Sequence, residues 1–317
     1  MAAALVFGCL LCGCIPAVPE QFPPRAAAPL VRAVLLTLLA FVCFDLMAVL
    51  VRMLLARYAA SELSTYRNIF GIFPSLLFLL YTRELRLDLR KLVIPQWRLA
   101  FARGGVVALA QLFFYAALGH MELATVSALG QTSSLFVVLL SIVFLGERVG
   151  PWRWFALGLG FLGAMWILRP GSDAFSAYAV MPVFAALCYA VSMITSRKFG
   201  PDVSSALLYL YSSIGAAVGA FVLALVFGDF TAITSVADLG LILAMATVGG
   251  CGVLLLTLSF RMAPPSALAP FSYFGIISSF LMGWVFFGEL PLDKLLPGVL
   301  FIFAAGAIIL WRENRRA

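Results

Sequence analysis

The chain has 317 residues, of which 64% are hydrophobic and only 11% are charged, and its mean hydropathy is +1.09. A soluble domain carries roughly 25% charged residues, so this chain lacks the polar coat that water requires, and lipid must surround most of its surface. The formal net charge of +7 therefore points to membrane orientation rather than to nucleic-acid binding, and no nucleic-acid partner is expected.

Apolar runs of about 20 residues follow one another along the chain, which is the length of a helix that crosses a ~30 Å hydrocarbon core. The runs show no alternation of polar and apolar residues, which excludes the strands of a membrane barrel. We predict an all-α integral membrane protein with ten transmembrane helices. Numbered from 1 to 10, they cover 31–54, 63–82, 97–119, 122–145, 151–168, 175–196, 204–227, 237–260, 264–287 and 292–311.

The first 28 residues are expected to form a loose tail. Residues 1–18 are apolar but lack the positively charged start of a signal peptide. A proline-rich stretch follows and would break any helix.

The basic residues are distributed unequally between the two sets of connections. If the N-terminus is cytoplasmic, fifteen of the 21 basic residues fall in inside segments, and the outside loops carry only Arg57, Arg169 and Lys294. This is the bias of the positive-inside rule. It predicts a multi-pass protein of the bacterial inner membrane with both termini in the cytoplasm.

The two halves of the chain resemble each other. Leu-Gly-Glu at 145–147 ends helix 4, and Phe-Gly-Glu at 287–289 ends helix 9. Each half, 29–170 and 171–317, holds five helices, and because five is odd the second half enters the membrane from the opposite side. We therefore predict inverted repeats, a design that is chiefly found in transporters and that allows alternating access around a central site.

On these motifs the sequence resembles the EamA domain of the drug/metabolite transporter superfamily. The first copy is similar over Ala128–Arg169, and the second over Ala263–Leu310, which also contains Ala269-Pro270. The first copy departs from the family pattern in helix 4, because Ser133 and Ser134 stand in the region where a proline is usual. The sequence therefore does not decide whether helix 4 is kinked.

The resemblance implies a ten-helix carrier whose cavity is lined mainly by helices 1, 3, 4, 6, 8 and 9. Members of the family move amino acids, nucleobase-like metabolites, vitamins, adenosyl compounds or drugs, mostly outward. We therefore expect a secondary transporter and exporter of a small organic solute. The alternative is an importer or exchanger of a metabolite such as S-adenosylmethionine or riboflavin.

Asp45 is the clearest functional candidate, because it lies in the middle of helix 1, where an ionised group costs free energy. A carboxylate at that depth needs a partner or a proton. It is interpreted as a group that couples transport to a proton or cation, or as half of a structural ion pair.

Three arginines lie within predicted helices. Arg67 in helix 2 could pair with Asp45, bind a substrate carboxylate in bidentate fashion, or form a structural pair near the interface. Arg52 lies near the outer end of helix 1 and is expected to reach the interface, and Arg103 is expected to reach the cytoplasmic headgroups.

Neutral polar side chains complete the candidate substrate-binding set. They suit a zwitterionic or planar polar solute, although each could equally serve as an interhelical hydrogen bond. Tyrosines near helix ends could also belong to the interfacial belt. The set comprises Asn68, Gln111, Tyr115, Gln131, Thr132, Tyr189, Ser272 and Tyr273.

Glycine and proline predict hinges and close contacts. Gly249, Gly250 and Gly252 in helix 8 and Pro270 in helix 9 are candidate hinges. The GxxxG pair at 215 and 219 predicts a close-packing face on helix 7.

Enzymatic chemistry is not expected. A membrane-embedded enzyme would need a nucleophile with a base, or a metal site, but the lone histidine lies in a tight loop and Asp45 is the one carboxylate deep within a predicted helix. No cofactor or metal is predicted. A non-transporting assembly protein is the remaining alternative, and the expected assembly is a monomer or homodimer.

Overall fold

The architecture was taken from a computed structural model. It describes residues 27–81, 95–145, 151–168, 177–196, 199, 203, 205–227, 230–233, 235–262, 268, 271–272, 274–289 and 296–314.

The described residues are almost entirely helical and include no strand, which confirms the all-α prediction. The first part of the chain forms α2 (Ala27–Leu54), α3 (Ala60–Tyr81), α4 (Trp97–Leu118), α5 (Leu123–Gly130), α6 (Ser133–Leu145) and α7 (Pro151–Leu168). The second part forms the 3₁₀ turn η3 (Ala177–Ala179), α8 (Val180–Ser196), α9 (Ser205–Phe227), α10 (Val236–Met262), α12 (Phe274–Phe287) and α14 (Gly298–Asn314).

Five helical segments are long and apolar enough to cross a membrane. They are Val31–Leu54, Trp97–Leu118, Leu123–Phe144, Leu207–Val226 and Val236–Leu256, the third of which includes both α5 and α6. Four shorter apolar helices are Trp154–Ile167, Val180–Ser196, Phe274–Phe287 and Gly298–Ile308. These segments fall within or beside the predicted ranges, while the count of ten spans stays a prediction.

Helix 4 is broken rather than continuous. Gln131 and Thr132 form a turn between α5 and α6. Both the N–H and the hydroxyl of Thr132 donate to the carbonyl oxygen of Leu129, at 3.1 and 2.6 Å. A threonine side chain that bonds back to its own helix bends that helix. The chain therefore breaks helix 4 without the proline that the family pattern would supply.

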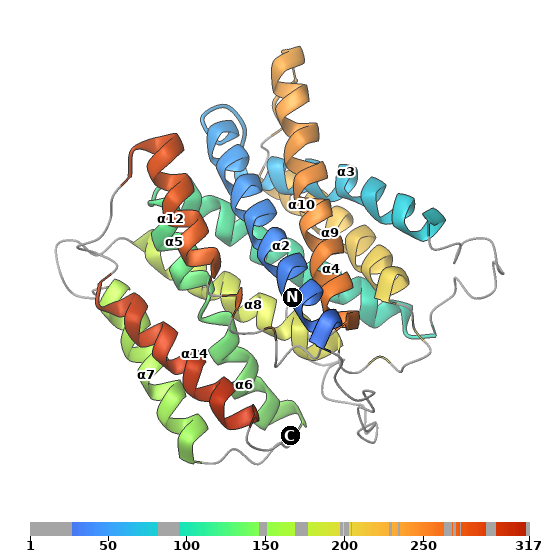
Figure 1. Ribbon diagram of the computed structural model, residues 1–317. Coiled ribbons are helices and arrows are strands. Elements are labelled where there is room, and N and C mark those ends of the chain that lie inside the picture. Colours follow the sequence, from blue (N-terminus) through green and yellow to red (C-terminus); the bar gives the residue numbers. More distant parts are fainter. Residues whose placement is uncertain are drawn as a thin grey trace.

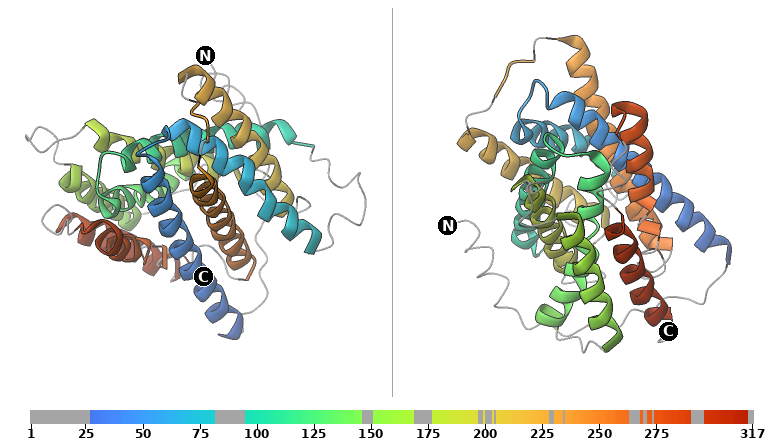
Figure 2. Two further views of the ribbon diagram at one scale, coloured as in Figure 1. Left: turned by 90° about the horizontal axis from the view of Figure 1, so that it is seen from above. Right: turned by 90° about the vertical axis from the view of Figure 1, so that its left-hand side faces the viewer.

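Helices from the two halves interleave. α2 packs against α10, α4 packs against both α8 and α9, and α3 packs against α9 and α10. α7 and α14 form a pair that stands to one side of the other helices, at the lower left of Figure 1 and again to one side in Figure 2. The two halves of the chain therefore pack together into a shared core.

Glycines allow the backbones of α4 and α9 to touch. A methyl group on Gly104 would collide with the carbonyl oxygen of Ser212 and with backbone atoms of Gly215. A methyl group on Gly215 would in turn collide with the backbone of Phe101, and one on Gly219 would lie 3.2 Å from the Cα atom of Gly105. The close-packing face predicted from Gly215 and Gly219 is confirmed.

Polar contacts join the α2–α3 turn and the start of α3 to α10 and to the segment before it. Arg57 forms an ion pair with Asp238, whose carboxylate also accepts a hydrogen bond from Tyr58 at 3.1 Å. Glu62, in the first turn of α3, accepts the backbone N–H of Thr231 at 3.0 Å. These contacts fix that end of the helix bundle.

Replacing Gly104 with alanine should lower the thermal unfolding midpoint. The new methyl group would collide with backbone atoms of α9, which cannot move aside as a flexible side chain could. Overpacking of this kind costs about 1–3 kcal/mol. Thermal unfolding of the purified protein in detergent measures the effect. Gly105→Ala is the matched control, since its methyl group would meet nothing within 4 Å; an equal loss in both variants would contradict the backbone contact.

Candidate functional site

A left-handed glycine ends α12 and directs the following glutamate back into the protein. Gly288 has φ of +67° and its N–H donates to the carbonyl oxygen of Trp284 at 3.0 Å, which is an αL helix cap. The chain therefore reverses at Gly288, and Glu289 comes to lie between α2 and the start of α5. The prediction that the second Gly-Glu pair stops its helix is confirmed, whereas residues 146 and 147 of the first pair lie outside the described residues.

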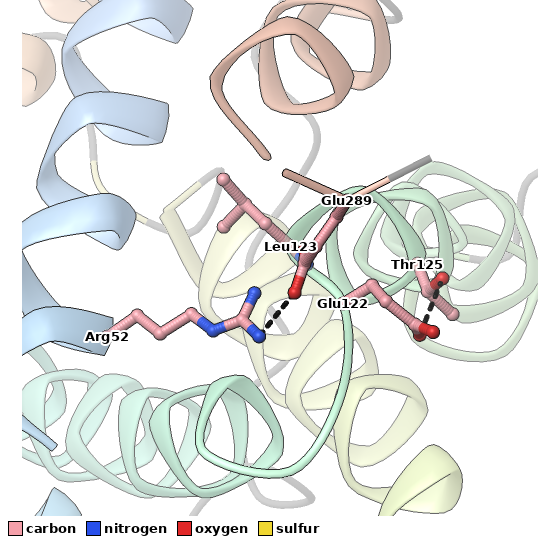
Figure 3. A network of polar contacts seen from close by, with 5 residues as sticks. All are labelled: Arg52, Glu122, Leu123, Thr125 and Glu289. Carbon is pink, nitrogen blue, oxygen red and sulfur yellow. Dashed lines mark hydrogen bonds and ion pairs between the residues drawn. The ribbon is translucent and has the colours of Figure 1, made fainter. Parts of the chain in front are cut away.

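Glu289 joins three helices (Figure 3). One carboxylate oxygen forms an ion pair with Arg52 of α2, and the other accepts the backbone N–H of Leu123 at 3.0 Å. Leu123 is the first residue of α5, where unpaired N–H groups and the helix dipole favour a carboxylate. The guanidinium of Arg52 also lies over the Phe287 ring, 4.5 Å from its centre. The structure gives Arg52 a partner within the protein, while its position relative to the membrane interface stays a prediction.

Two interrupted segments meet at Gln131. Its amide nitrogen donates to the backbone carbonyl of Ser272, 3.1 Å away, just before α12 begins. An ideal Cβ on Gly275 would lie 3.3 Å from this amide nitrogen and 3.0 Å from the Phe41 ring, so α2, α5 and α12 converge here.

Asp45 lies one turn beyond Phe41 on α2 and faces α12. Its carboxyl group lies close to the side chain of Ser278, and its Oδ2 atom has no hydrogen-bond partner among the described residues. The side chain is only 7% exposed. We call Asp45, Ser278, Gln131 and Ser272 the aspartate cluster.

Arg67 lies elsewhere, with its side chain held by a chain of amides. Its Nη1 atom donates to Oδ1 of Asn68 at 3.0 Å. The amide nitrogen of Asn68 donates in turn to Gln111 Oε1 at 2.6 Å and to the Ser64 carbonyl at 2.8 Å. These bonds fix which way the Asn68 amide points, so the orientation of the guanidinium is set by α3 and α4 together.

Three tyrosines surround this guanidinium. Tyr115, Tyr189 and Tyr209 all interact electrostatically with Arg67 and come from α4, α8 and α9. The Tyr115 hydroxyl lies 3.9 Å from the sulfur of Met47. We call Arg67, Asn68, Gln111, Met47 and the three tyrosines the arginine cluster.

The comparisons with known proteins identify the family. The model of the EamA-like transporter family matches residues 31–169. The pseudopaline exporter of Pseudomonas aeruginosa is 31% identical over 278 residues, covering 87% of this chain and 95% of the exporter. A riboflavin transporter of Rhizobium johnstonii is 33% identical over 283 residues, covering 88% of this chain and 90% of the relative.

The chain belongs to the EamA-like transporter family.

A more distant relative and a solved structure extend the comparison. An S-adenosylmethionine uptake transporter of Rickettsia bellii is 26% identical over 191 residues, or 60% of this chain and 65% of that protein. A crystal structure of a protein with 16% sequence identity superposes on this chain with a TM-score of 0.63. The match covers 92% of this chain and 99% of the other protein, which shows that the two share a fold.

This EamA-like transporter is a multi-pass membrane protein that moves a small metabolite. Its family and its relatives are named transporters and not enzymes, which confirms the choice of a carrier over a membrane-embedded enzyme. Within the described part of the transporter, no three His, Cys, Asp or Glu residues are grouped closely enough to hold a metal ion.

The structure separates residues that the sequence analysis considered together. Asp45 and Arg67 do not form an ion pair; in the described part of the transporter the ion pairs are Arg52–Glu289 and Arg57–Asp238. Thr132 uses its hydroxyl within its own helix. Tyr273 and Pro270 lie outside the described residues, so their roles stay predictions.

Arg103 is hydrogen-bonded within the helix bundle, while its expected reach to the headgroups stays a prediction. Its Nε atom donates to the carbonyl oxygen of Ser192 at 2.9 Å, and its Nη1 atom donates to the hydroxyl of Ser212 at 2.7 Å. The guanidinium thus lies between α4, α8 and α9.

The glycines of helix 8 lie in an unbroken α10 and make close contacts. A side chain on Gly249 would collide with Met47, one on Gly250 with Pro74, and one on Gly252 with Phe44. These positions let α2 and α3 approach α10. Their action as hinges stays a prediction.

Sequence reasoning missed several members of the two clusters. Tyr209, Met47 and Ser278 belong to residue types that are common in membrane helices, and no motif marks them. The resemblance implied a cavity lined mainly by six helices, and helices 2 and 7 were not among them. These two helices contribute Arg67 and Tyr209 to the arginine cluster. The unusual feature that could have pointed to this site was Arg67 itself, a cation within an apolar run.

Arg52 and Glu289 should show energetic coupling in a double-mutant cycle with Arg52→Gln and Glu289→Gln. Each single variant leaves a partly buried charge without its partner, so we expect each to lose about 1 kcal/mol or more, with a coupling energy above about 0.5 kcal/mol. Thermal unfolding in detergent measures all four proteins. Glu289→Ala should lose more than Glu289→Gln, because only glutamine retains an acceptor for Leu123; additive effects would contradict the pair.

Proposed function

We propose that this chain is a secondary carrier that exports a small organic metabolite across the bacterial inner membrane by alternating access. It is built from ten transmembrane helices in two inverted five-helix repeats, 29–170 and 171–317, preceded by a tail, 1–28. The exchange symmetry of the helix packing is the observation that carries this proposal.

Exchanging the two halves turns α2, α3, α4 and α7 into α8, α9, α10 and α14. The packing of α2 on α10 then becomes that of α8 on α4, and the packing of α4 on α9 becomes that of α10 on α3; all four pairs occur. The pairs α3–α9 and α7–α14 map onto themselves, and both also occur. This correspondence supports the inverted repeat, and such a repeat provides two equivalent conformations that open to opposite sides.

The orientation rests on the charge bias of the connecting segments. Fifteen basic residues fall in the segments that are inside when both termini are cytoplasmic. Reversing the orientation would place this excess on the outer side, against the positive-inside rule.

Export is the direction that the relatives favour. The relative named as an exporter aligns with 87% of this chain, whereas the relatives named for uptake align with 57–60% of it. The riboflavin transporter carries no direction in its name. Uptake or exchange is the alternative.

Asp45 is the proposed coupling group. A buried carboxyl group with one oxygen unpartnered has capacity for a proton or a cation. Its contact with Ser278 also connects helix 1 of the first repeat with helix 9 of the second, so a change in its charge acts on the contact between repeats.

Asp45→Asn should abolish the dependence of transport on a pH gradient, because an amide cannot exchange a proton. Transport is measured in proteoliposomes with amino acids, riboflavin and S-adenosylmethionine, with and without the gradient. We expect gradient-driven transport to fall at least about tenfold, while Asp45→Glu keeps the dependence. Full pH dependence in Asp45→Asn would remove Asp45 from coupling, and a folded wild-type protein that moves no solute under any gradient would refute the carrier.

A further inference from the structure

The guanidinium of Arg67 carries a buried charge that no described carboxylate balances. Its side chain is 7% exposed. Its hydrogen-bond partner is the neutral amide of Asn68, and both described ion pairs involve other arginines. A buried cation that meets only neutral dipoles lowers stability unless an anion accompanies it. The charge therefore requires a partner that is not part of the described chain.

A second uncompensated cation lies nearby. Arg103 donates to a serine hydroxyl and a backbone carbonyl, both of which are neutral. Tyr209 lies near enough to both Arg67 and Arg103 to influence each of them electrostatically. Ser212, which holds Arg103, lies one turn from Tyr209 on α9. The two charges together favour a ligand of net negative charge.

Glu62 is a buried charge whose stabilisation can be explained within the protein, in contrast to Arg67. This carboxylate is fully buried and also lacks a cation within the described structure, but it lies in the first turn of α3 and accepts the N–H of Thr231 and the hydroxyl of Tyr66. Free N–H groups and the helix dipole stabilise an anion at that position. Arg67 lies about 10 Å along the same helix, away from either end, and has no such support.

The free edge of Arg67 has the shape of a carboxylate site. Asn68 occupies Nη1, while the buried Nε has no hydrogen-bond partner among the described residues, so the edge formed by Nε and Nη2 keeps unused donors for a ligand. That edge presents two parallel N–H groups, which match the two oxygens of a planar carboxylate. The Tyr209 hydroxyl is also unpartnered in the described structure and offers a third polar contact.

The surroundings suit an organic body attached to that carboxylate. Met47, Tyr115 and Tyr189 supply a polarisable sulfur and two aromatic rings around the guanidinium. With Gly249, whose ideal Cβ would lie 3.4 Å from Arg67 Nε, they bring α2, α3, α4, α8, α9 and α10 together. A ligand bound here would contact both proposed repeats at once.

We infer that the arginine cluster binds the carboxylate of a small organic anion, with Arg67 as its bidentate partner and Arg103 as a second source of positive potential. This inference rests on the proposed carrier function and names the class of its substrate.

One test needs no knowledge of the solute. Met47 and Arg67 both lie against Gly249, so Met47→Glu puts a carboxylate beside the open guanidinium edge in a side chain of similar length, and Met47→Gln is the neutral control. We expect Met47→Glu to unfold at least about 3 °C above Met47→Gln in detergent, because it neutralises a buried charge. If Met47→Glu unfolds at or below the temperature of Met47→Gln, the open anion site is refuted.

A second test uses matched pairs of acid and amide. The wild-type protein in detergent is incubated with 3-phenylpropionate, phenylsuccinate, N-acetylglutamate and their amides, and thermal stabilisation is recorded; uptake of the same compounds is measured in proteoliposomes. We expect acids to stabilise the protein and to be carried, at least about tenfold better than their amides. Arg67→Gln should remove this preference and Arg67→Lys should weaken it, whereas Arg98→Gln, which removes an exposed arginine at the start of α4, should leave it unchanged.

The outcomes separate the two proposals. Transport of neutral or cationic solutes that Arg67→Gln leaves intact would overturn the anion site and keep the carrier. A folded protein that binds and moves none of the solutes in either panel would overturn the carrier, and the anion site with it.

Discussion

Within hydrocarbon, every backbone N–H and C=O group and every charge must find its partner inside the protein, because no water is present to supply one. Continuous helices meet this demand by themselves, so the polar contacts of this transporter concentrate where helices stop. At the break in helix 4, Thr132 bonds back to Leu129 and the neighbouring Gln131 reaches the Ser272 carbonyl. At the start of α5, Glu289 accepts the N–H of Leu123. The interruptions in one half of the chain are thus completed by groups from the other.

The same constraint distinguishes structural polar groups from functional ones. Arg57, Tyr58 and Asp238 satisfy one another, and Arg52 is neutralised by Glu289. Asp45 and Arg67 are buried to the same degree, yet neither meets an opposite charge in the described structure. Glu62 and Arg103 also have no described counter-ion, but Glu62 lies at a helix start and accepts two hydrogen bonds, and Arg103 donates two. The unpaired charges of Asp45 and Arg67 are therefore the basis of the roles proposed for them.

Composition and loop charge were enough to predict a helical membrane protein, because hydropathy and helix length are properties of local sequence. Local signals also identified the end of α12 at Gly288 and the close packing at Gly215 and Gly219. Side-chain direction was not predictable in this way. Arg52 and Arg103 were both expected to extend toward the membrane surface, but their acceptors lie on helices that are distant in sequence. Tyr209 was missed for the same reason, since its significance comes from the two arginines beside it.

The glycine contact between α4 and α9 has a consequence for how this molecule can change shape and evolve. Two helices whose backbones touch at Gly104 and Gly215 cannot slide past each other without lifting apart, yet one belongs to each half of the chain. If the proposed alternating access occurs, α4 and α9 are expected to move together, so the moving bodies would combine parts of both halves. A chimera that joined the first half of this chain to the second half of a relative would inherit two mismatched surfaces.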